Sequence, residues 1–199
     1  MELNVHGQQI DVGDALRTHV SDKLEDLNQK YFNHGTFATV TFSREGHGNP
    51  QTKAHISIQM GKNIMVVADA VANDPYVSFE SAAEKVGKQL RRYKRRLRDH
   101  HARMEQTPES EIIKARKYVL AATPEQDQDN ASEAESGTDP VVIAELSKDI
   151  ETMSVSEAVM RMDLSDETAM VFKNASNSKI NMIYRRSDGN ISWVDPDNI

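Results

Sequence analysis

The chain of 199 residues contains no cysteine. This absence excludes a disulfide framework, a thiolate metal site and a cysteine nucleophile, and it is typical of a reducing compartment. Long apolar stretches are missing too, because no run approaches the roughly 18 residues that a membrane-spanning helix needs. The first residues, from Met1 to His6, lack the basic region and apolar core of a secretory signal. We therefore expect a soluble, cytoplasmic protein that does not enter a membrane.

Patterns typical of enzymes are also scarce. The sequence has no Gly-rich phosphate loop, no nucleophile elbow and no convincing carboxylate pair. Its seven histidines form neither an HExxH motif nor an i,i+4 pair, and the adjacent His100 and His101 would point in different directions on a helix. We predict no catalytic residue, no metal ligand, no cofactor and no small-molecule substrate.

Charge is distributed unevenly along the chain, whose net charge is −7. Residues 1–120 hold 18 Lys and Arg against 15 Asp and Glu, whereas residues 121–199 hold 6 against 16. Nine basic residues and a single acid, Asp99, fall between residues 85 and 103. A local cluster sets the local affinity for phosphate, because charges farther away than the Debye length of roughly 8–10 Å are screened.

The periodicity of residues 1–105 predicts an α+β domain of the order β-α-β-β-β-α, a four-stranded sheet with two helices on one face. Apolar residues recur at helical spacing from Leu16 to Tyr31 and again from Tyr76 to Leu97. Asp74 is expected to cap the second helix, with Pro75 at its first position. Alternating runs between the helices predict the strands.

The rest of the chain divides into a linker and a small second domain. We assign residues 106–139 to an extension and an acidic linker, whose part from Thr123 to Asp139 has six acids and no base and is expected to be disordered. Residues 140–199 are predicted to form a β-α-β-β-β domain. Ser154 and Glu157 are expected to form the capping box of its helix.

The strongest functional signal is the segment from Lys88 to Arg98, in which seven of eleven residues are basic. The intervening Leu90, Tyr93 and Leu97 would face the core, so the other face of the helix presents dense positive charge. Solvated helix faces mix charge signs at i,i+4, whereas these like charges repel one another without a ligand. Arginine forks hold phosphate oxygens and release counterions, so the pattern favours nucleic-acid binding.

Several stretches resemble a known family. The segments 7–16 and 73–94, with Asn-Asp-Pro-Tyr at 73–76, resemble the ribosome hibernation-promoting factor and ribosome-associated inhibitor family, also called sigma-54 modulation proteins. The segments 153–159, 171–174 and 184–190 resemble the second domain of its long-form members. The resemblance implies that the first domain sits between head and body of the small ribosomal subunit. There it would contact rRNA at the decoding region and overlap the mRNA and tRNA sites.

The resemblance also implies site residues. The tail domain would homodimerise and pair two ribosomes in an inactive dimer. The strands of the tail carry apolar residues on both sides, and on that ground we place the dimer contact at Phe172 and Ile183. The RNA-facing candidates share a positive charge: Lys23, Lys85, Lys88, Arg91, Arg92, Lys94, Arg95 and Arg96. Arg17 and Lys30 could widen this surface. The expected function is translational silencing under stress or in stationary phase, achieved by occlusion.

Three alternatives stay open. A general regulator of double-stranded RNA or mRNA would bind naked RNA helices nearly as tightly as ribosomes. A sigma-factor-modulating regulator would use the acidic tail to bind a protein. A ribonuclease using His100 or His101 would cleave RNA during long incubation.

Overall fold

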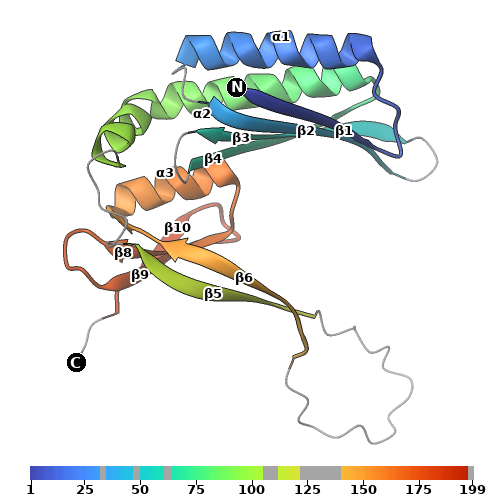
Figure 1. The fold of residues 1–199 in the computed structure, drawn as a ribbon. Helices are drawn as coiled ribbons and strands as arrows, with labels where there is room; N and C mark the ends of the chain where they lie inside the picture. Colours follow the sequence, from blue (N-terminus) through green and yellow to red (C-terminus); the bar gives the residue numbers. More distant parts are fainter. Residues whose placement is uncertain (32–34, 47–49, 61–63, 105–111, 122–139, 197–199) are drawn as a thin grey trace, which may run out of the picture.

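A computed structural model of the chain describes residues 1–31, 35–46, 50–60, 64–104, 112–121 and 140–196 (Figure 1). The N-terminal domain runs in the order β1 (Glu2–Gln8), α1 (Asp14–Tyr31), β2 (Gly35–Glu45), β3 (Gln51–Met60), β4 (Ile64–Ala72) and α2 (Pro75–Met104). The later elements are β5 (Ile113–Leu120), β6 (Val142–Ile150), β7 (Thr152–Met153), α3 (Val155–Ser165), β8 (Ala169–Asn174), β9 (Ile180–Arg185) and β10 (Ile191–Val194).

The first sheet has the order β1-β2-β3-β4, with β1 parallel to β2 and the other pairs antiparallel. A parallel pair needs a crossover, and α1 supplies it. Buried and less buried residues alternate along β3, along most of β4 and through the middle of β2 from Ala38 to Phe42, as the alternating sequence predicts. Figure 1 shows α1 and α2 lying together on one side of this sheet. The predicted β-α-β-β-β-α order is therefore confirmed.

The two helices bury the apolar faces that their spacing predicts. On α1 the buried face includes Leu16, Val20 and Leu24, and on α2 it includes Phe79 and Leu90. All of them belong to the core between helices and sheet. This core fixes the rotation of α2 about its own axis, so it also fixes which side chains of the helix face outward.

The start of α2 follows the predicted capping pattern. The Asp74 carboxylate accepts hydrogen bonds from the backbone N–H of Tyr76 at 2.8 Å and of Val77 at 3.2 Å. Such a cap contributes about 1 kcal/mol by satisfying N–H groups that the helix leaves unpaired.

The small C-terminal unit, residues 152–194, contains a second sheet of order β10-β9-β8-β7, in which β7 runs parallel to β8. With α3 it gives the predicted β-α-β-β-β order, but the first strand of its sheet is β7. The predicted strand around Val142 is part of β6, which pairs with β5 in a separate two-stranded sheet. The expected disordered segment 123–139 lies wholly outside the described residues.

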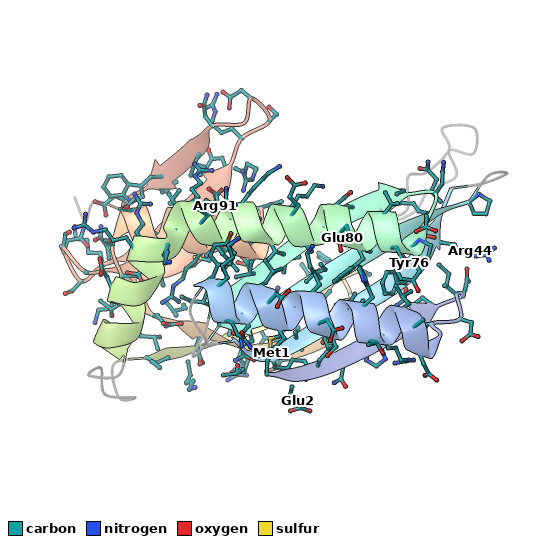
Figure 2. The ribbon with its side chains drawn as sticks, turned by 90° about the horizontal axis from the view of Figure 1, so that it is seen from above. Met1, Glu2, Arg44, Tyr76, Glu80 and Arg91 are labelled. Atoms are coloured by element: carbon teal, nitrogen blue, oxygen red, sulfur yellow. The ribbon has the colours of Figure 1, made fainter. Side chains whose placement is uncertain are left out.

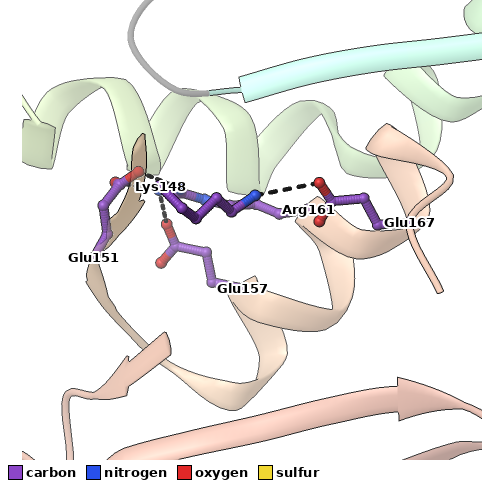
Figure 3. Close-up of polar contacts among 5 residues, drawn as sticks. All are labelled: Lys148, Glu151, Glu157, Arg161 and Glu167. Carbon is purple, nitrogen blue, oxygen red and sulfur yellow. Dashed lines mark hydrogen bonds and ion pairs between the residues drawn. The ribbon is translucent and has the colours of Figure 1, made fainter. Parts of the chain in front are cut away.

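Buried ion pairs connect α3 to the end of β6 (Figure 3). The Ser154 hydroxyl accepts from the backbone N–H of Glu157 at 3.3 Å, as predicted. The Glu157 carboxylate accepts a hydrogen bond from Arg161 at 3.3 Å, and Arg161 also donates two hydrogen bonds to the Glu151 carboxylate at 2.9 and 3.0 Å. All three side chains are less than a tenth exposed, so the cluster ties α3 to the end of β6.

Candidate nucleic-acid interface

The C-terminal half of α2 carries the densest positive charge on the described part of the chain. Leu90 and Tyr93 face the core and are 2 % and 5 % exposed. The basic residues around them are exposed because they occupy the remaining arc of the helix. We call this set the basic ridge: Lys88, Arg91, Arg92, Lys94, Arg95 and Arg96.

On one side the basic ridge borders a groove of about 600 Å³ between α1 and α2. These two helices lie side by side in Figure 2. Arg91 lines this groove and donates to the Tyr31 hydroxyl at 3.3 Å. Lys30 also lines it, with its ammonium 5.7 Å from the centre of the Tyr31 ring. The groove therefore extends the positive surface of α2 toward α1.

Three of the predicted RNA-facing residues have carboxylate partners, of which the pair between Arg95 and Asp99 is the longest at 4.0 Å. Lys23 donates to Glu80 at 2.6 Å, and this hydrogen bond lowers the pKa of Glu80 below its ordinary value. Lys88 lies 2.9 Å from Glu84, whose pKa the hydrogen bond lowers in the same way. Such exposed pairs contribute little to stability, so a phosphate can replace the carboxylate at small cost.

Two other predicted residues lie at the margins. Lys85 donates to the backbone carbonyl of Asp69 on β4 at 2.5 Å, so its ammonium points toward the sheet edge. Arg17 donates to the carbonyls of Val5 and Val12 at 2.8 and 3.2 Å. Arg17 therefore has a structural role between β1 and α1, and the idea that it widens the RNA surface is not favoured.

The side of the basic ridge away from α1 meets the C-terminal unit. Arg92 and Arg96 lie over the Tyr93 ring, 5.2 and 5.9 Å from its centre. The Tyr93 hydroxyl donates to Asp163 of α3 at 2.5 Å. Burial, followed by this hydrogen bond, raises the pKa of Tyr93 to about 12. Sequence reasoning missed this contact because nothing local in either segment indicates its partner.

The residues predicted to form the dimer contact are inside the protein. Phe172 and Ile183 are both 0 % exposed and pack beneath α3 in the core of the C-terminal unit. On the opposite face of this sheet, Val171, Met182 and Val194 lie opposite one another in neighbouring strands and are 38–45 % exposed. The exposed apolar row therefore lies on the face of the sheet opposite to the predicted contact residues, Phe172 and Ile183.

Other kinds of site find no support in the described ranges. There, no group of three or more His, Asp or Glu side chains is arranged to hold a metal ion. Within the same ranges no helix is both long and apolar enough to cross a membrane. The side chains of His100 and His101 lie outside the described set, so the ribonuclease alternative gains nothing from the geometry.

Two protein-family models match the chain in order. The model of the sigma 54 modulation protein / S30EA ribosomal protein matches residues 3–98. The model of the C terminus of the same family matches residues 137–192. The two matches correspond to the N-terminal domain with its basic ridge and to the segment from the linker to β10.

Three relatives that match nearly the whole chain are all ribosome hibernation promotion factors. The ribosome hibernation promotion factor of Bradyrhizobium diazoefficiens is 38 % identical over 199 residues, covering 98 % of this chain and 95 % of the relative. That of Rhizobium meliloti is 33 % identical over 199 residues and covers 100 % and 99 %. That of Bacillus subtilis is 26 % identical over 200 residues and covers 98 % and 99 %.

Two solved structures resemble the chain in part. The N-terminal domain of Thermus thermophilus Protein Y is 22 % identical with a TM-score of 0.41, covering 47 % of this chain and 99 % of that one. A ribosomal subunit interface protein from Coxiella burnetii is 21 % identical with a TM-score of 0.42, covering 47 % and 98 %.

Proposed function

The chain belongs to the sigma 54 modulation protein / S30EA ribosomal protein family as a long-form, non-enzymatic ribosome hibernation promotion factor, and we propose that it silences translation by binding small-subunit rRNA through the basic ridge of α2. The observation that carries this proposal is the gathering of six cations on one half of a helix whose opposite face is locked in the core. Bound at the decoding region, the domain would exclude mRNA and tRNA by its bulk.

The chemistry of the basic ridge fits folded RNA. Four of its six cations are arginines, whose planar guanidinium groups hold phosphate oxygens in a two-pronged geometry. Each neutralised phosphate releases counterions, which favours binding without reading a base sequence. A surface of this kind recognises the shape of a folded RNA, as an occluding factor requires.

A sedimentation experiment tests this function. The full chain is mixed with purified small ribosomal subunits and separated on a sucrose gradient, with a naked RNA duplex as competitor. We expect the chain to travel with the subunits and to resist a mass excess of duplex. Equal binding to the duplex would favour the general RNA regulator, and cleaved RNA would favour the ribonuclease. A chain that ignores subunits but retains a sigma factor would favour the protein regulator.

The outward face of the second sheet is our candidate for homodimerisation. Val171, Met182 and Val194 form its centre, and Ile180 and Tyr184 lie on the same face. A unit this small leaves apolar area uncovered, and a two-fold partner covers the same patch on both copies. The predicted contacts Phe172 and Ile183 would then act indirectly, by holding the sheet in shape.

Light scattering on the full chain tests the dimer. We expect a dimer at micromolar concentration, and we expect Met182→Glu to weaken it by at least about tenfold, because a carboxylate would be buried without a partner. Val77→Glu is the matched control, since Val77 is 55 % exposed on α2 of the N-terminal domain. A monomeric parent chain, or a Met182→Glu chain that dimerises like the control, would exclude this face.

A further inference from the structure

Two apolar cores share the helix α3. Met160 and Leu164 are completely buried and belong to the core of the N-terminal domain. Ala158 and Met162, also buried, belong to the separate core above β8 and β9. The side of α3 that carries Met160 and Leu164 rests against β4 and the C-terminal half of α2 (Figure 1). The C-terminal unit is therefore docked on the domain that carries the basic ridge.

Polar contacts connect the docked helix to the basic ridge itself. Asp163 of α3 accepts the hydrogen bond from Tyr93, and Arg96 donates to the backbone carbonyl of Ser156 at 3.5 Å. Arg185 of β9 holds the second oxygen of Asp163 at 3.0 Å. The Asp163 carboxylate is thus oriented from both domains and stands beside the cations of α2.

The charges on the two sides of this contact are complementary. A hollow of about 550 Å³ is lined by Lys88 and Arg92 from α2 and by Asp163 and Asp166 from the end of α3. Arg185 of β9 also lines it and forms an ion pair with Asp163 at 3.0 Å. A phosphate that approached these cations from this side would meet two carboxylates. The surplus of acids in residues 121–199, 16 against 6 basic residues, adds repulsion of the same sign.

We infer that the docked C-terminal unit and rRNA compete for the side of α2 that carries Lys88, Arg92 and Arg96. The free chain is closed, and RNA binding displaces α3 from β4 and α2. Arg91 and Lys94 lie outside the hollow, so RNA can make its first contact with them. Only the open fraction binds with full affinity, so docking weakens the apparent affinity by that fraction.

Distances between two spin labels test the closed state directly. The chain has no cysteine, so Ser21→Cys on α1 and Ala175→Cys after β8 give two unique and exposed labelling sites. The labelled chain is diluted with an excess of unlabelled chain, so that only the distance within one copy is measured even if the chain dimerises. We expect one narrow distance distribution in the free chain, and a longer, broader one when small ribosomal subunits are in excess. A broad distribution in the free chain, or a narrow one that persists on the subunits, would overturn the inference.

Charge reversal tests the competition. Asp163→Arg removes the partner of Tyr93 and repels Arg92 and Arg96, so we expect subunit affinity to rise about three- to tenfold. Glu145→Arg makes the same change of charge on β6, away from the hollow, and corrects for added positive charge. Tyr93→Phe removes the same hydrogen bond without changing charge and should raise the affinity in the same direction. The competition would be refuted if Asp163→Arg bound subunits no more tightly than Glu145→Arg and Tyr93→Phe bound them no more tightly than the parent chain.

This inference rests on the proposed RNA contact, but the two can fail separately. If the chain does not bind subunits at all, the proposed function is excluded. The label distances in the free chain still show whether α3 docks on the N-terminal domain. If the chain binds subunits while α3 stays docked, the proposed function is retained and the proposed competition is excluded.

Discussion

Reversing four charges on the basic ridge should abolish binding to the small ribosomal subunit while leaving the fold intact. The variant carries Glu in place of Arg91, Arg92, Arg95 and Arg96. These side chains are exposed, and the contacts they lose are surface interactions. They are the hydrogen bonds from Arg91 to Tyr31 and from Arg96 to the Ser156 carbonyl, the ion pair between Arg95 and Asp99, and the stacking of Arg92 and Arg96 on the Tyr93 ring. Glu is a good helix former, so we expect a loss of folding stability of only about 1 kcal/mol.

The loss of binding should be much larger. If about five phosphates are neutralised, the logarithm of the binding constant falls with the logarithm of salt concentration at a slope near −3.5 to −4.5. Removing four cations should bring this slope close to zero, since each phosphate contact contributes about one unit. At about 1 kcal/mol or more for each charged contact, the dissociation constant rises by at least about a thousandfold.

The assay is equilibrium sedimentation with small subunits across a salt series, with circular dichroism to confirm the fold. The control reverses Arg116, Lys117, Lys148 and Arg186, which changes the net charge from −7 to −15 just as the test variant does. These four residues lie on β5, on β6 and after β9, away from the basic ridge. A folded test variant that binds as tightly as the control, with an unchanged salt slope, would refute the role of the basic ridge.

Three further outcomes follow from the packing. Arg161→Ala removes the cation that Glu151 and Glu157 share in the buried cluster and should destabilise the C-terminal unit by about 3–5 kcal/mol in urea unfolding, whereas Lys148→Ala, at a surface pair, should cost less than about 1 kcal/mol. Gly7→Ala would push a Cβ into the carbonyl of Ile10 and should lower stability by about 1–3 kcal/mol, while Gly13→Ala, with open space around it, should not. The pKa of Tyr93 is raised from 10.0 to about 12, so its contribution to stability is complete below pH 10 and is lost as pH rises through about 12. An alkaline unfolding curve unchanged by Tyr93→Phe would contradict this.

The pairing of strands that are distant in the chain could not be predicted from the sequence. The strand β5 pairs with β6 across more than twenty intervening residues, and no local pattern selects that partner. The alternation in β9 separates Met182 from Ile183, but it does not say which face a helix will cover. For this reason the dimer contact was predicted at Phe172 and Ile183, which the structure buries under α3.

The sequence by itself determined the order of elements, the cap at Asp74 and the outward charge of α2, because periodicity and capping are local properties that a buried face enforces. It also carried the resemblance that the family comparisons confirm. Only the tertiary structure decided where α3 docks, which side of the second sheet faces outward and that Tyr93 meets Asp163. These features depend on the shapes of two surfaces brought together from distant parts of the chain, and free energy of packing, not local preference, selects them.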